Sequence, residues 1–355
     1  MRLRAHPRTF WLATWLIGLA LLVYVIKQAG FNTLLAQMGR LGWSFGALIL
    51  LSGGRHILRT VAWSACITSA KLRTKFLRLL GIRLVGEAAA DLTLAGPLLG
   101  ESLKVWLASS GLPTAYSLSS VVLENLMYSL AVGYFILGGI AIVLLTSLGT
   151  REIRLFLTAG LIVLIVFILL PYYILKQRHR LLTQILEWSK QHYPCWRWRE
   201  RHEETLKRCE ESVLSFYHVH RQLFYYVFLG EIATNFTGVA EAYIILKVTS
   251  GHESFVAAYL LEAMNRMVTV IFGFIPLRLG VDEGSTALMM NGLGYPGVDG
   301  VSLALVRKLR TLVWVSLGVY LMPQYTIPCG EEAATPQVPV RGPTNGDEKA
   351  DRQCR

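Results

Sequence analysis

Two long stretches of this sequence carry no charged side chain. Residues 125–150 are uncharged over 26 residues and residues 155–175 over 21. A helix needs about 20 apolar residues to cross the ~30 Å hydrocarbon core of a bilayer, so both stretches predict membrane-spanning helices. Further spans are predicted at residues 10–26, 45–69, 222–248, 255–277 and 311–330.

The composition supports a membrane protein. Of the 355 residues, 53% are hydrophobic and 16% are charged, and the mean hydropathy is +0.45. A soluble surface needs roughly 25–35% Lys, Arg, Glu and Asp. The net charge of +12 lies between the apolar stretches, as on a cytoplasmic membrane face. These features exclude a soluble enzyme, a disordered chain and a nucleic-acid-binding module, so no nucleic-acid partner is expected.

Two apolar pieces are too interrupted to form simple spans. Residues 84–107 contain a Gly96-Pro97 break and four charges, and residues 279–298 contain adjacent acids and several glycines. Backbone that leaves a helix inside a membrane must be covered by protein or line a wet cavity. The predicted fold is an all-α polytopic membrane helix bundle with about seven spanning helices, two re-entrant or broken-helix elements and an internal repeat.

Basic residues predict the domain organisation and orientation. Residues 71–83 hold five basic and no acidic side chains, and residues 176–221 hold ten basic and six acidic ones. Both segments and the N-terminus are therefore predicted to be cytoplasmic. Residues 1–325 form the predicted membrane domain, in which 176–221 is either an interfacial helix with aromatic anchors or a solvated linker. Residues 326–355 predict a disordered tail.

Several ionisable side chains interrupt the apolar stretches at helical spacing. Four pairs stand out: Arg55 with Arg59, Glu87 with Asp91, Glu101 with Lys104, and Glu262 with Arg266. A charge near the bilayer centre costs roughly 2.5–3.5 kcal/mol. The charges therefore either pair with one another within the bundle or line a polar cavity that a substrate enters, and the sequence leaves both interpretations open.

The two broken pieces resemble each other. Residues 96–102 read GPLLGES and residues 275–284 read IPLRLGVDEG, so each places Pro, Leu, Gly and an acid in that order. Paired Gly/Pro-interrupted segments indicate a binding site near the membrane midplane, where a half-helix N-terminus can receive an anion. The candidate substrate-binding residues are Arg55, Arg59, Glu87, Pro97, Gly100, Glu101, Lys104, Glu124, Glu262, Arg266, Pro276, Gly280, Asp282, Glu283 and Arg307.

Nothing in the sequence predicts a cofactor, a metal or a catalytic centre. The five cysteines are scattered and form no Cys-x-x-Cys pair. Glu231 and Glu241 are ten residues apart, which places them ~80° apart around a helix rather than on one face. Asp282 and Glu283 precede an apolar run, as residues at a helix N-terminus do. The protein is therefore not expected to be an enzyme.

Residues 97–101, 119–124, 280–283 and 307–310 together resemble the lysylphosphatidylglycerol synthase transmembrane-region family, also called flippase-like, over roughly residues 10–322. The resemblance implies a multi-span protein of the bacterial inner membrane that handles lipid. Family members commonly have Arg where this chain has Leu98, and Glu-Arg where it has Glu124-Asn125. If those arginines hold a head-group phosphate, other cations replace them here; the candidates are Arg55, Arg59, Arg266, Arg278 and Arg307.

These features favour a protein that binds or translocates a modified phospholipid or glycolipid, with a polycyclic isoprenoid lipid as a further candidate. The alternative is a non-enzymatic scaffold subunit, whose partner would be a lipid-synthesis enzyme. A membrane-embedded enzyme is the third hypothesis, and it lacks a nucleophile–base constellation. The sequence does not predict the lipid, the energy source or the oligomeric state.

Overall fold

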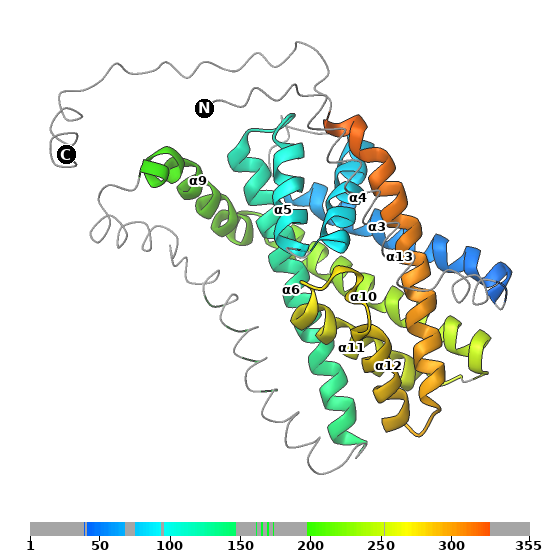
Figure 1. The fold of residues 1–355 in the computed structure, drawn as a ribbon. Helices are drawn as coiled ribbons and strands as arrows, with labels where there is room; N and C mark the ends of the chain where they lie inside the picture. The colour runs from blue at the N-terminus through cyan, green and yellow to red at the C-terminus, as the bar shows by residue number, and fades with distance from the viewer. Residues whose placement is uncertain are drawn as a thin grey trace, which may run out of the picture.

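The computed structural model describes residues 39, 41–67, 75–93, 96–146, 197–251 and 253–326, with isolated positions between 161 and 173. Within these residues the chain forms nine α-helices and one 3₁₀ turn and no strand, so the predicted all-α class is confirmed (Figure 1). The predicted span at 10–26, nearly all of 155–175, the segment 176–196 and the predicted tail lie outside the described residues.

Two units with the same order of helices build the structure. Each unit has a long helix, a pair of short helices and a second long helix. The first unit comprises α3 (Trp43–Cys66), α4 (Phe76–Leu92), α5 (Gly96–Ala108) and α6 (Thr114–Leu145). The second comprises α10 (Arg221–Ser250), α11 (Phe255–Phe272), α12 (Val281–Gly292) and α13 (Gly297–Thr326), and α9 (Arg197–Val219) precedes it. This order matches the internal repeat predicted from the two broken segments.

The two units are inverted relative to each other. In Figure 1, α6 runs from top to bottom and α13 from bottom to top, with the α4–α5 pair above and the α11–α12 pair below. Helix α4 packs on α13 and α11 packs on α6, while α3 and α10 pack on each other. Exchanging the two units reproduces this set of contacts, as expected for an inverted repeat.

Small residues permit these equivalent contacts. A Cβ atom on Gly318 of α13 would lie 2.7 Å from the Cβ of Ala88 on α4. A Cβ atom on Gly139 of α6 would lie at the same 2.7 Å from the Cβ of Ala263 on α11. Close helix approach over small residues is typical of membrane bundles, where apolar burial alone does not drive helices together.

The tips of the two short helix pairs meet. A Cβ atom on Gly96 would collide with the carbonyl oxygen of Gly273, and one on Gly273 would lie 3.6 Å from Cγ of Pro97. Helices α5 and α12 have 13 and 12 residues, so they are about 20 and 18 Å long and too short for the ~30 Å core. The prediction of two broken-helix elements therefore agrees with the structure.

The second break begins earlier than predicted. The predicted span 255–277 ends at Phe272, because Gly273 and the 3₁₀ turn Pro276–Arg278 interrupt the helix. Leu277 and Arg278 both adopt positive φ angles, of 47° and 45°. Such strain in non-glycine residues is maintained only when the surrounding structure fixes it, and it is common at ligand sites. The first broken element is also longer than predicted, since α4 begins at Phe76 rather than at residue 84.

Local sequence explains where the second pair of short helices begins. Ser254 caps α11, and its Oγ accepts a hydrogen bond from the backbone N–H of Ala257 at 3.2 Å. Gly280 precedes α12 with a φ of 81°, and its N–H donates to Oε2 of Glu283 at 2.9 Å. This bond, from the N-cap N–H to the acid three residues later, is the half of a capping box that needs no N-cap side chain, and it supports the predicted capping role of this segment.

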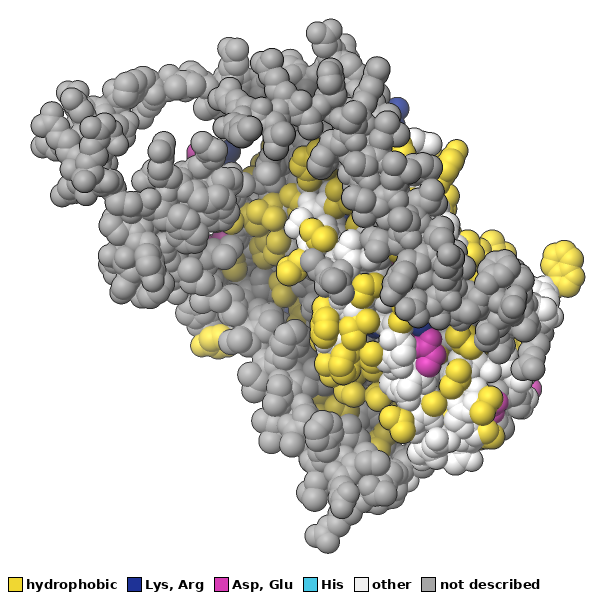
Figure 2. All heavy atoms as spheres, viewed as in Figure 1, with side chains coloured by type: hydrophobic (Ala, Val, Ile, Leu, Met, Phe, Trp, Pro, Cys, Tyr) yellow, Lys and Arg dark blue, Asp and Glu magenta, His cyan; other side chains and the backbone are white. Residues whose placement is uncertain are grey.

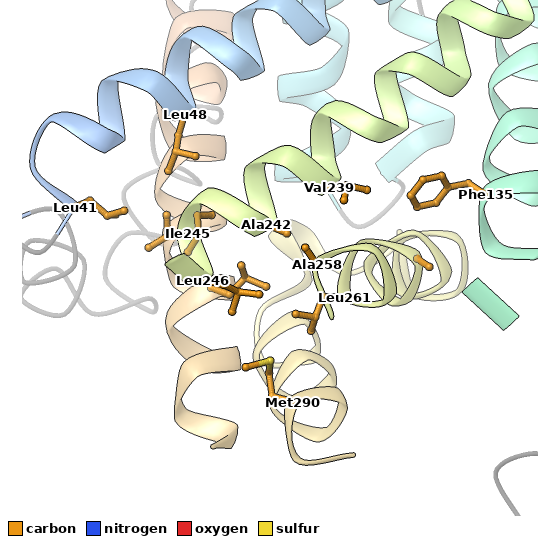
Figure 3. Packing of buried hydrophobic residues seen from close by; sticks show 13 residues of the cluster. Leu41, Leu48, Phe135, Val239, Ala242, Ile245, Leu246, Ala258, Leu261 and Met290 are labelled. Carbon is orange, nitrogen blue, oxygen red and sulfur yellow. The ribbon is translucent and has the colours of Figure 1, made fainter. Parts of the chain in front are cut away.

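The largest apolar cluster joins both units. Figure 3 shows Leu48 of α3, Ile245 and Leu246 of α10, Leu261 of α11 and Met290 of α12 packed together. All are buried. This contact fixes the second pair of short helices against the crossing of α3 and α10.

Many large apolar side chains of the described residues are exposed. On the face drawn in Figure 2, the described side chains are mainly hydrophobic, and charged ones show at only a few places. Among the described helices, α6 and α11 are long and apolar enough to cross a membrane, by length and composition. Helices α3, α10 and α13 do not reach this level, so the number of spans stays a prediction.

Candidate functional site

A central cavity of about 200 Å³ lies where the two units meet. Its walls come from the long helices of both units, from α4 and α11, and from the turn before α12. The polar and aromatic residues that line it are Arg55, His56, Arg59, Glu87, Asp91, Tyr128, Thr234, Asn265, Arg266, Thr269, Arg278, Arg310, Thr311 and Trp314. The two breaks in the chain therefore lie beside one shared hollow.

The cavity wall is strongly cationic. Five arginines line it, whereas Glu87 and Asp91 are its only two acids in the described part of the chain. Guanidinium groups bind carboxylate or phosphate oxygens in a bidentate manner, because their N–H donors form a fixed planar fork. The wall is therefore suited to an anionic ligand.

Arg55 is the most loosely held of these arginines. Its ion pair within the described residues is with Glu241, where Nη1 lies 4.0 Å from Oε2. Glu241 also forms a close ion pair with Arg310 of α13. Arg55 lines both the central cavity and an adjoining smaller one of about 30 Å³. Its guanidinium is thus available to a ligand without breaking a tight internal pair.

A buried carboxylate organises the first unit. Glu124 of α6 is fully buried, and Oε1 accepts hydrogen bonds from Arg83 Nη2 at 2.6 Å and Arg59 Nη2 at 3.0 Å. Its Oε2 lies 3.4 Å from Nζ of Lys104. One acid thus meets cations from α3, α4 and α5. Pairing of this kind is required because an isolated charge in an apolar interior is prohibitively costly.

A second carboxylate plays the matching role in the other unit. Glu262 of α11 pairs with Arg266 one turn away at 2.7 Å and with Arg307 of α13 at 2.5 Å. The predicted pairing of Glu262 with Arg266 is therefore present. Nη2 of Arg307 also lies 3.4 Å from the carbonyl oxygen of Gly238 on α10. Arg307 and Glu262 both line the smaller cavity.

The acids at the tips of both units contact the next long helix. Oε2 of Glu101 accepts a hydrogen bond from Asn125 Nδ2 at 2.8 Å, and the same oxygen lies 2.7 Å from Nζ of Lys104. In the second unit, Glu283 forms a close ion pair with Lys308 of α13. These equivalent contacts tie each broken segment to its own long helix.

The turn between α11 and α12 directs Arg278 into the cavity. Its Nε donates to Oδ1 of Asp282 at 3.0 Å. Asp91, on the facing wall, has no ion pair within 4 Å in the residues that the structure describes, although it is close enough to Arg278 to interact electrostatically. The strained backbone at this turn therefore sets one cation opposite an unpaired acid.

The structure gathers some of the predicted site residues and not others. Arg55, Arg59, Glu87 and Arg266 line the central cavity, and Glu262, Asp282 and Arg307 line the smaller one. The remaining predicted residues lie outside both cavities, in the tips or in the buried ion pairs; these are Pro97, Gly100, Glu101, Lys104, Glu124, Pro276, Gly280 and Glu283. Five cations were expected to replace the arginines that family members have and this chain lacks. Each of them lines one of the two cavities: Arg55, Arg59, Arg266, Arg278 and Arg307.

Sequence reasoning missed several residues of this region. Arg83 was assigned to the basic 71–83 loop, although it lies in α4 and its Nε donates to Glu87 at 2.9 Å. Its spacing of four residues from Glu87 was the available signal. His56 lies 2.9 Å from Glu87 through Nδ1. Arg310 and Trp314 of α13 also line the cavity and were not predicted.

The buried charges both pair within the bundle and line a polar cavity, and the entry of a substrate into this cavity stays a prediction. Nine cations lie in or beside the cavities: Arg55, Arg59, Arg83, Lys104, Arg266, Arg278, Arg307, Lys308 and Arg310. Nine acids accompany them: Glu87, Asp91, Glu101, Glu124, Glu231, Glu241, Glu262, Asp282 and Glu283. The network is balanced as a whole, yet the cavity wall itself carries more cations than acids.

Within the described residues, no group of three or more His, Cys, Asp or Glu side chains is placed to hold a metal ion.

Two inverted units with broken helices around a polar cavity define a class of helical membrane protein that is common among transporters. The sequence comparison is more specific. The chain belongs to the lysylphosphatidylglycerol synthase TM region family, which it matches over residues 11–318. It is therefore an integral membrane protein of a family associated with lipid modification. No curated protein matches the chain, and no solved structure does.

Proposed function

We propose that this protein binds the anionic head group of a modified phospholipid or glycolipid in the central cavity and moves it between membrane leaflets. The observation that carries the proposal is the position of the five cavity arginines, which line a cavity between the two inverted units, beside both helix breaks. In transporters built from such repeats, the substrate site lies at the repeat interface.

The size and charge of the cavity favour a head group over a whole lipid. Ligand pockets that enclose a drug-sized molecule occupy about 300–1,000 Å³. A cavity of about 200 Å³ accommodates a phosphodiester with a small polar substituent, while acyl chains remain in the surrounding membrane. Excess positive charge on the wall offsets the desolvation of the phosphate.

The membrane compartment, expected to be the bacterial inner membrane, and a lipid-synthesis enzyme as partner stay predictions. Translocation would need no cofactor on this proposal. The side chains of the cavity bind the head group. A rearrangement of the two inverted units then opens the cavity first to one leaflet and then to the other.

The test uses the full chain in proteoliposomes that contain fluorescently labelled phosphatidylglycerol. Arg55→Gln is the informative variant, because Glu241 retains Arg310 and no tight pair is broken. We expect at least a tenfold slower translocation, with partial recovery in Arg55→Lys. Arg208→Gln is the matched control, since Arg208 is exposed on α9 and pairs with Glu204.

Two results would overturn the proposal. Wild-type protein that moves labelled phosphatidylglycerol, other anionic phospholipids and glycolipids no faster than protein-free liposomes would exclude translocation. Equal rates for Arg55→Gln and Arg208→Gln would remove the central cavity as the site.

A further inference from the structure

One buried carboxyl group lacks the partners that the others have. Glu231 of α10 is fully buried, and within the described residues neither of its oxygens has a hydrogen-bond partner. The cation within ion-pair distance is Arg59, whose Nε lies 3.6 Å from Oε2. An ionised carboxylate in this position is poorly compensated, whereas a protonated carboxyl group is tolerated.

Arg59 is shared among three acids. Its Nη2 donates to Glu124 at 3.0 Å, and its Nη1 lies 3.7 Å from Glu87. Glu231 therefore shares one guanidinium with Glu124, which lies closer to it, and with Glu87, which lies at a similar distance. Arg59 also lines the central cavity and stacks on Tyr128, with its Cζ 4.2 Å from the ring centre. A ligand in the cavity would reach the same guanidinium.

Glu231 lies one helical turn from the cavity wall. Thr234, three residues further along α10, lines the cavity. Residues three apart lie on the same face of a helix. Asn235 adds a second unsatisfied group nearby, because its Oδ1 also lacks a hydrogen-bond partner among the described residues. Its Nδ2 donates to the carbonyl oxygen of Glu231 at 2.9 Å.

We propose that Glu231 is a proton-binding site, and that its protonation releases Arg59 for a lipid phosphate in the central cavity. The inference rests on the proposed function and adds the ion that accompanies the lipid. One proton adds to a carboxylate oxygen of Glu231, and no other bond changes. The balanced network of nine cations and nine acids then carries one uncompensated positive charge, which the phosphate neutralises.

The charges around Glu231 come from several packed helices. Four charged groups act on it electrostatically: Arg59 of α3, Glu124 of α6, Arg83 of α4 and Arg266 of α11.

The remaining packed helices place their charged groups elsewhere. Helix α13 contacts α10 through Arg307 at Gly238 and Arg310 at Glu241, about two and three turns beyond Glu231. Helix α9 buries Glu210. His56, which pairs with Glu87, and Asp91, which has no ion pair within 4 Å among the described residues, are titratable groups that line the cavity, so each needs its own control.

The test measures the affinity of the detergent-solubilised full chain for dihexanoyl phosphatidylglycerol by calorimetry between about pH 5.5 and 8.5. The phosphodiester stays ionised over this range. If one proton binds with the lipid, the dissociation constant rises with pH by at most about tenfold per unit. We expect this dependence in the wild type, in His56→Asn and in Asp91→Asn. Glu231→Gln, a permanently neutral isostere, should bind tightly at every pH.

Glu253→Gln is the matched control, because this exposed glutamate between α10 and α11 pairs only at the surface with Lys247. It should keep the wild-type dependence. A wild-type measurement in two buffers of different ionisation enthalpy gives the proton uptake directly, so the test survives if Glu231→Gln does not fold. An uptake that approaches one proton per lipid is expected at the alkaline end.

Each result decides between the two proposals. Lipid binding that is independent of pH, without proton uptake, overturns the role of Glu231 and leaves the lipid site intact. A pH dependence that persists in Glu231→Gln overturns the role of Glu231, and its loss in His56→Asn or in Asp91→Asn assigns the proton to that residue instead. No binding at any pH in the wild type overturns the proposed function itself.

Discussion

Replacing Glu124 with Gln should destabilise the protein more than any other single change of a carboxylate to its amide. Glu124 is fully buried and meets three cations, at 2.6 Å from Arg83, 3.0 Å from Arg59 and 3.4 Å from Lys104. The amide cannot neutralise these charges. Breaking a buried pair by removing one partner costs about 3–5 kcal/mol, because the remaining charge is left uncompensated.

The consequence is measurable as a thermal shift in detergent. A loss of 1 kcal/mol lowers the melting temperature by roughly 2–4 °C in domains of about 150–250 residues, so Glu124→Gln should lower it by at least about 6 °C. Glu204→Gln is the matched control: Glu204 pairs with Arg208 at 2.5 Å, but both side chains are exposed. Exposed pairs contribute about 0–1 kcal/mol. Similar melting temperatures for the two variants would refute the argument that Glu124 holds the first unit together.

Three further predictions concern packing, capping and thiol reactivity. Gly100→Ala should destabilise the α4–α5 pair by about 1–3 kcal/mol, because the new Cβ would lie 2.6 Å from the carbonyl oxygen of Gly86. Gly284→Ala, whose Cβ would meet nothing within 4 Å, should not lower the melting temperature, and equal losses would contradict this. Glu283→Ala should cost about 3–5 kcal/mol, because it removes the oxygen that accepts from the Gly280 N–H and leaves buried Lys308 without its ion pair. Glu283→Gln should cost less, because its amide oxygen can still accept from Gly280, as chemical denaturation would measure. Burial raises the pKa of the Cys209 thiol on the polar helix α9 to about 11, so at pH 8 alkylation should be on the order of a hundredfold slower than for a free thiol; rapid labelling in mass spectrometry would disprove the buried position.

The sequence alone determined the helical class, the presence of two breaks and the contacts that lie within one helix. Uncharged stretches of sufficient length can satisfy their backbone in a membrane only as helices, so composition was enough. Glu262 with Arg266, and Glu101 with Lys104, followed from helical spacing, because residues three or four apart share a face whatever the tertiary structure. The cap at Gly280 and Glu283 is equally local.

Only the tertiary structure decided which distant charges meet. Arg59 and Glu124 are 65 residues apart, and Arg310 and Glu241 are 69 apart. The contact of Gly96 with Gly273 joins the two breaks across an even longer separation. Such contacts depend on how the helices cross, which no spacing along one helix encodes. For the same physical reason, the sequence left open whether the buried charges pair with one another or line a cavity. The structure shows that the same ionisable groups do both. The arrangement of the two units determines which of these groups face the cavity.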